Sequence, residues 1–192
     1  MTNYLSFFQQ NDFALREENS FPNVYQIIGK DGVQSGIARQ RDMNVYVMDS
    51  FIRGIRRNMP FIIDICDTEG RLLSTIRRGW SGGFAPVLLE DSAGNLLGIA
   101  KPEWNWRGMV FALSDEHQEW VGEVLRWDFG KRYSVKTHEL RVLGEIVKEP
   151  KFTWHPTQDR YNIRISPDQD PKIKMLILAS VILIDMIEHE ER

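Results

Sequence analysis

The chain has 192 residues, of which 42% are hydrophobic and 27% charged, a length and composition typical of one folded domain. Its 24 basic and 27 acidic side chains give a net charge of −3, which argues against sequence-independent binding to nucleic acid, because such proteins carry a basic excess. Cys66 is the only cysteine, which excludes an intramolecular disulfide and a zinc site built from cysteines.

Residues 1–22 are interpreted as an N-terminal extension. The segment has neither a basic start nor a continuous apolar core, so it does not read as a signal peptide. Its apolar side chains predict a short amphipathic helix that packs on the following domain, plugs it or lies on a membrane. Packing is favoured because the polar face is not basic. These apolar residues are Tyr4, Leu5, Phe7, Phe8, Phe13 and Leu15.

From residue 23 to residue 170 the pattern indicates β-strands separated by turns that contain Asp and Gly. No alternation of strands with helical patterns appears, which favours a sandwich or a barrel. The runs rich in β-branched or aromatic residues are 24–28, 45–48, 61–66, 72–77, 87–89, 96–100, 109–113, 120–127, 140–147 and 160–165.

Three hairpins look like copies of one another, with turns at Asp67-Thr-Glu-Gly70, Asp91-Ser-Ala-Gly94 and Asp115-Glu-His-Gln118. The leading aspartates are 24 residues apart in both steps (91 − 67 and 115 − 91). Repeated hairpins predict a β-meander, and a long meander closes into a barrel to remove its edges. The third turn lacks the glycine, so we expect its conformation to differ. Asp31-Gly32 predicts an earlier hairpin of the same kind.

The last element is a helix expected over residues 171–189, capped by Asp170 and started by Pro171. It is apolar on every face, and such a helix must be surrounded by protein, which in a single-domain β-protein means the inside of the barrel. Its charge-free run, 175–184, is well short of the roughly 18–20 residues that span a bilayer. We expect the charged Asp185 near the barrel mouth, bonded to backbone or to an arginine.

The segment Tyr161-Asn-Ile-Arg-Ile-Ser-Pro-Asp-Gln-Asp-Pro-Lys-Ile-Lys-Met175 resembles the C-terminal segment of the phospholipid scramblase family. Asn23-Val-Tyr25, Pro60-Phe61 and Asp67-x-x-Gly70 follow the order of that family. The resemblance implies a tubby-like fold over residues 23–192, a closed antiparallel twelve-stranded β-barrel around a central hydrophobic C-terminal helix. The plant LURP-one-related group, which shares this fold, is also similar.

The resemblance also implies a calcium segment, which aligns with residues 157–170. Asp159, Asp168 and Asp170 are kept there, but Thr157 stands at the leading acidic position and two arginines interrupt the loop. Calcium requires six to eight oxygen ligands. The residues themselves favour a simpler interpretation, in which Asp168 ends a strand and Asp170 caps the helix. No other cofactor is expected.

The candidate binding site is a set of basic and aromatic residues in the connections between hairpins. Arginine forks bind phosphate and indoles suit a membrane interface, so the set predicts an anionic headgroup site at one end of the barrel. The alternative is an ordinary solvated surface with tryptophans that partly cover the barrel. The residues are Arg53, Arg56, Arg57, Arg77, Arg78, Trp80, Lys101 and Trp104, with Trp106 and Arg107 beside them.

The sequence contains no recognisable catalytic constellation. The histidines show no metal-ligand spacing, and neither a nucleophile elbow nor a P-loop occurs. The glycines after Trp80 are interpreted as a bulge or turn, and Cys66 as a thiol packed in a strand rather than a nucleophile. The histidines are His117, His138, His155 and His189.

Together these features predict a non-enzymatic cytoplasmic barrel, peripheral at the membrane, that binds anionic phospholipids or another protein and has no transmembrane span. Two alternatives stay open. One is transbilayer movement of lipid, as the family resemblance implies. The other is transport of a small hydrophobic ligand in space beside the helix.

Overall fold

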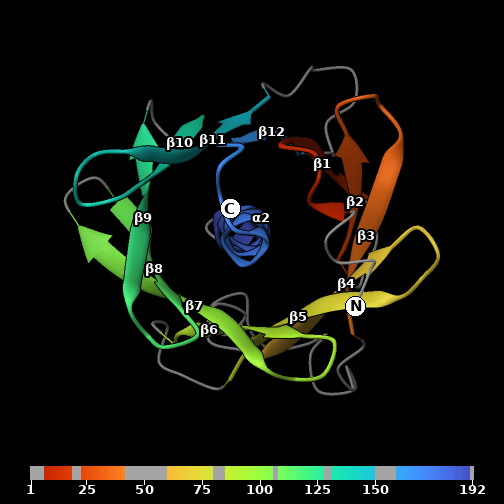
Figure 1. Cartoon of the computed structure of the whole chain (residues 1–192), viewed down its shortest axis with the longest axis horizontal. Coiled ribbons are helices and arrows are strands. Elements are labelled where there is room, and N and C mark those ends of the chain that lie inside the picture. The colour runs from red at the N-terminus through yellow and green to blue at the C-terminus, as the bar shows by residue number, and fades with distance from the viewer. Residues whose placement is uncertain are drawn as a thin grey trace.

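The structure is a computed structural model that describes residues 7–18, 23–41, 60–79, 85–105, 108–127, 131–149 and 159–190. Twelve strands of this part of the chain form a ring around one helix (Figure 1). They are β1 (Asp12–Glu18), β2 (Val24–Gly29), β3 (Gln34–Gln40), β4 (Phe61–Asp67), β5 (Leu72–Arg78), β6 (Val87–Asp91), β7 (Leu96–Asn105), β8 (Gly108–Asp115), β9 (Trp120–Trp127), β10 (Arg132–Lys136), β11 (Val142–Lys148) and β12 (Arg160–Ile165), and the helix is α2 (Pro171–Glu190).

Every strand pairs antiparallel with its neighbours in chain order, and β1 closes the ring by pairing with both β2 and β12. The alternation of each strand turns one set of side chains inward, as in β4, where Phe61, Ile63 and Ile65 are buried. Full closure removes the unpaired edges that a twelve-stranded meander would otherwise expose. The expected fold class, a closed antiparallel barrel around a central C-terminal helix, is confirmed.

Phe13 and Leu15 differ from expectation, because they lie on strand β1 and not on an N-terminal helix. Both side chains point into the barrel and are buried. The apolar spacing of two residues, 13 and 15, fits a strand better than a helix once β12 offers a partner. Phe7 stacks on Phe13 with ring centroids 5.7 Å apart, so the chain before β1 covers one mouth of the barrel. Tyr4, Leu5 and the strand expected at 45–48 lie outside the described residues.

The helix α2 is held at its start by Asp170, whose Oδ1 accepts a hydrogen bond from the Lys172 backbone N–H at 2.8 Å. All of its side chains from 174 to 186 are buried. The helix and the wall approach closely at Gly98, where a Cβ atom would meet a Leu176 methyl at 3.2 Å. No helical segment among the described residues, α2 included, combines the length and apolarity that crossing a bilayer demands.

The three repeated turns share one geometry, which corrects our expectation for the third. The leading aspartate of each turn, at 67, 91 and 115, accepts two backbone N–H groups at 2.8–2.9 Å. Gly70 and Gly94 have φ values of 77° and 85°, and Gln118 adopts the same left-handed conformation with φ 64°. The hydrogen bonds to the aspartate therefore impose this conformation even where the residue is not glycine.

The buried position of α2 predicts the effect of changing Ile182, whose side chain is fully buried in the middle of the helix. Ile182→Ala should lower the free energy of unfolding by about 2–5 kcal/mol, and Ile182→Asp should give insoluble or unfolded protein, since it buries an unpaired charge. Chemical denaturation and solubility measure both. A soluble Ile182→Asp protein that unfolds cooperatively would mean that α2 lies at the periphery.

The left-handed Gln118 predicts a stabilising substitution. Gln118→Gly relieves a backbone strain of about 1–2 kcal/mol and costs about 0.5–1 kcal/mol of chain entropy, so the melting temperature should rise by about 1–3 °C. Gly94→Ala, at the equivalent position of the preceding turn, should lower it. Equal melting temperatures for Gln118→Gly and wild type would show that this turn carries no strain.

Candidate functional site

The meander gives the barrel two different ends. The hairpin end consists of the tight turns at 30–33, 68–71, 92–95, 116–119, 137–141 and 166–170, together with the start of α2. The loop end consists of the strand ends from which the chain continues through 19–22, 41–60, 79–86, 106–107, 128–131 and 149–159. The last turns of α2 lie toward the loop end, because Asp185 contacts Tyr161 at the start of β12.

The described members of the basic and aromatic set lie near the loop end but engage neighbouring groups. Arg77 is exposed, and its Nη2 lies 3.2 Å from Glu90 Oε2. The Arg78 side chain is buried over the Phe61 ring, with Cζ 4.5 Å from the centroid. Lys101 is exposed, and its Nζ lies 3.7 Å from Glu103 Oε1. Arg77 and Lys101 thus share the outer face, whereas Arg78 belongs to the interior.

The rest of this set cannot be placed as side chains. Trp104 belongs to β7 by its backbone, and its side chain lies outside the description, as do the residues that complete the set: Arg53, Arg56, Arg57, Trp80, Trp106 and Arg107. Their chain positions still fix which end they belong to. Residues 42–59 join β3 to β4 and residues 80–84 join β5 to β6, and all four of these strands end or begin at the loop end.

The structure does not bring Asp159, Asp168 and Asp170 together. Asp159 immediately precedes β12 and Asp168 follows it, so the strand places them about 20 Å apart at opposite ends of the barrel. Asp168 is exposed in the hairpin end and pairs with Arg141. Asp170 caps α2 as expected. Only Asp159 lies among other acidic groups.

A cluster of buried polar side chains occupies the interior at the loop end. Glu17 of β1, Asp159 and Asp185 of α2 each place a carboxylate oxygen within 4.8 Å of the others. Lys148 Nζ lies 2.9 Å from Asp159 Oδ2, and the Tyr161 hydroxyl donates a hydrogen bond to Asp185 Oδ1 at 2.8 Å. Within the described part of the chain, no other trio of histidine, cysteine or acidic ligands comes this close together.

Tyr25 of β2 completes this cluster. Its side chain is 1% exposed, and its hydroxyl forms no hydrogen bond of ordinary geometry. Burial, followed by the charge of Asp185, raises the pKa of Tyr25 well above its usual value, and Glu17 and Asp159 add to the effect. The hydroxyl therefore stays neutral and lies against three carboxylates. We call the side chains of Glu17, Tyr25, Lys148, Asp159, Tyr161 and Asp185 the acidic cluster.

Sequence reasoning found only part of this cluster. Asp185 was recognisable as a charge within an apolar helix, although its partner is a tyrosine hydroxyl and not backbone or an arginine. Glu17 and Lys148 lie in strands with mixed patterns that give no signal. The chemistry of the cluster is that of an oxygen-rich, mostly acidic chamber, able to hold protons or a cation.

The remaining nucleophile and base candidates lie away from this cluster. Cys66 faces outward on β4, because Ile63 and Ile65 take the inward positions, and partial burial raises the pKa of its thiol. His117 is exposed in the hairpin end, and His138 stacks on Trp120 with centroids 3.5 Å apart. His155 and the side chain of His189 lie outside the description.

Comparison with known proteins gives two matches. The model of the family described as Scramblase matches residues 4–191. A crystal structure of a protein from Arabidopsis thaliana superposes with a TM-score of 0.60 at 10% identity, over 95% of this chain and 95% of that chain. At this identity the second match concerns the fold alone. None of the curated proteins matches the chain.

The Lys148–Asp159 pair predicts a large effect on stability. Lys148→Met removes the cation that contacts a buried carboxylate and should lower the free energy of unfolding by about 3–5 kcal/mol. Adding Asp159→Asn should restore much of the loss. Arg77→Met, which breaks an exposed pair with Glu90, should cost about 0–1 kcal/mol. Equal losses for Lys148→Met and Arg77→Met in urea denaturation would contradict this assignment.

Proposed function

The chain belongs to the Scramblase family, and on that premise we propose that it is a non-enzymatic barrel that binds anionic phospholipid headgroups at a membrane surface. The observation that carries the proposal is the asymmetry between the two ends of the barrel. The hairpin end is closed by short turns, whereas the loop end carries the long connections and the basic residues within them.

The residue types in these connections suit phosphate. Arg53, Arg56 and Arg57 lie in the chain between β3 and β4, and Trp80 lies in the chain between β5 and β6. A guanidinium donates two parallel hydrogen bonds to a phosphate, and an indole suits the boundary between headgroups and acyl chains. Arg77 and Lys101 add positive charge on the outer face near the same end.

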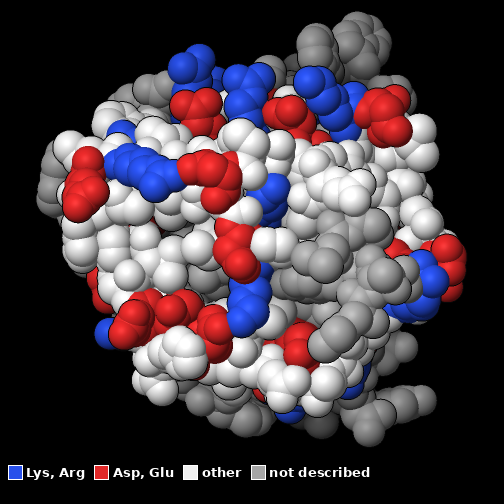
Figure 2. All heavy atoms as spheres, viewed as in Figure 1, with Lys and Arg blue, Asp and Glu red and all other residues white. Residues whose placement is uncertain are grey.

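The described surface supports a local site rather than a general attraction to membranes. Figure 2 shows basic and acidic side chains interleaved on the face that it draws, with no broad area of one sign among the coloured residues. Together with the net charge of −3, this favours binding through a few arginines at one end. A neutral membrane should therefore not retain the protein.

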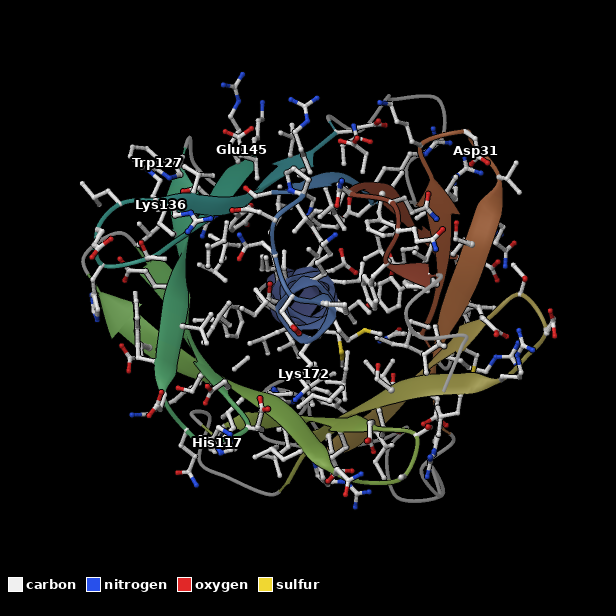
Figure 3. All side chains as sticks on the ribbon, viewed as in Figure 1. Asp31, His117, Trp127, Lys136, Glu145 and Lys172 are labelled. Carbon is white, nitrogen blue, oxygen red and sulfur yellow. The ribbon has the colours of Figure 1, made fainter. Side chains whose placement is uncertain are left out.

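Transport of a small hydrophobic ligand finds less support. The inward side chains of the strands and all those of α2 from 174 to 186 are buried against one another and fill the ring around the helix (Figure 3). A groove of about 320 Å³ lies on the outside of the barrel, but charged residues line much of it, including Asp12, Lys30, Glu145 and Arg164.

Flotation with vesicles tests the proposal. The protein should float with vesicles that contain phosphatidylserine or phosphoinositides and not with phosphatidylcholine alone. The double variant Arg56→Ala/Arg57→Ala should lower the partition coefficient about 30-fold, since each basic residue near an anionic surface contributes about 1 kcal/mol.

The matched control changes two basic residues of the hairpin end, Lys30→Ala/Arg141→Ala, and should float like the wild type. The proposal fails if the wild type floats with no anionic vesicle, or if the two double variants lose binding equally.

A further inference from the structure

We propose that the acidic cluster at the loop end is a binding site for one hard divalent cation of the size of calcium, with Glu17, Asp159 and Asp185 as its carboxylate ligands. The site is internal, and it does not depend on the headgroup binding proposed above. It also differs from the continuous segment 157–170, because it takes one residue from that segment and two from β1 and α2.

The spacing of the oxygens fits such an ion. Calcium binds oxygen at about 2.3–2.6 Å, so two ligands of one ion lie at most about 5 Å apart. The carboxylate oxygens of Glu17, Asp159 and Asp185 all lie within 4.8 Å of one another. Three carboxylates supply up to six oxygens, which approaches the six to eight that calcium takes.

The Tyr25 hydroxyl is a second and independent indication of a ligand. It is buried, it forms no hydrogen bond of ordinary geometry, and the charges that act on it are those of the same three carboxylates. Buried hydroxyl groups are almost always hydrogen-bonded in proteins, and a bound ion or water is a common reason for one that is not. An ion among the three carboxylates would give this oxygen a partner.

Burial makes the electrostatic requirement stronger. Asp159 and Asp185 are 1% and 0% exposed, and carboxylates without counter-charge are costly in such an environment. Lys148 offsets one negative charge through its contact with Asp159. The alternative to a cation is retention of protons on the carboxylates, which is the competing outcome of the experiment below.

The position of the site gives cation binding a structural consequence. Glu17 ends β1, Asp159 starts β12 and Asp185 lies near the end of α2, so one ion would join the central helix to the wall at the point where the barrel closes. Cation binding should therefore stabilise the whole fold and not only a surface loop.

Terbium luminescence and thermal unfolding of the full chain test the proposal without lipid. Terbium(III), a calcium analogue, should luminesce when the adjacent Tyr25 and Tyr161 are excited, and calcium chloride should displace it. Calcium at about a hundred times its dissociation constant should raise the melting temperature by roughly 5–10 °C, and magnesium should raise it less.

Two variants locate the site. Asp185→Asn and Glu17→Gln should each abolish the calcium-dependent rise, while far-UV circular dichroism shows that they remain folded. If one of them fails to fold, the other decides. Asp168→Asn, which changes an exposed carboxylate of the hairpin end, is the matched control and should keep the full rise.

Three results would overturn the proposal. The first is a wild-type melting temperature that calcium does not change, which would assign protons to the cluster. The second is a calcium effect that survives in Asp185→Asn and Glu17→Gln. The third is its loss in Asp168→Asn, which would assign the ion to the continuous segment.

Discussion

The fold depends on one constraint, which is the burial of a helix that is apolar around its whole circumference. An ordinary amphipathic helix needs one apolar neighbour, but α2 needs neighbours on every side. A closed ring of strands supplies them, and the alternation of each strand provides an apolar inner face. The barrel and the helix therefore form one core, in which neither part can be buried without the other.

The same arrangement makes the two ends of the barrel chemically different. At the hairpin end, aspartates such as Asp67 and Asp91 satisfy the backbone of short turns, and Phe7 packs over the mouth. At the loop end the chain is free to vary, and the interior changes from apolar to acidic around Asp185. A stable closed end and a variable polar end are a common division between scaffold and function.

The sequence was sufficient for the architecture because its decisive signals are local. Repeated hairpins and the apolar run of α2 together exclude most alternatives. The errors came from tertiary contacts: β1 is a strand because β12 pairs with it, and Gln118 is left-handed because Asp115 fixes the turn. The acidic cluster was beyond reach, since Glu17 and Asp185 meet only after the whole barrel has closed.

Native-state hydrogen exchange tests the central claim most directly. If α2 is the core of the barrel, its buried amides from 174 to 186 should exchange only through global unfolding, with the same opening free energy as the slowest amides of the strands. Exchange of these amides at a much lower opening free energy, while the strands stay protected, would show that the barrel stands without its helix and would contradict the account.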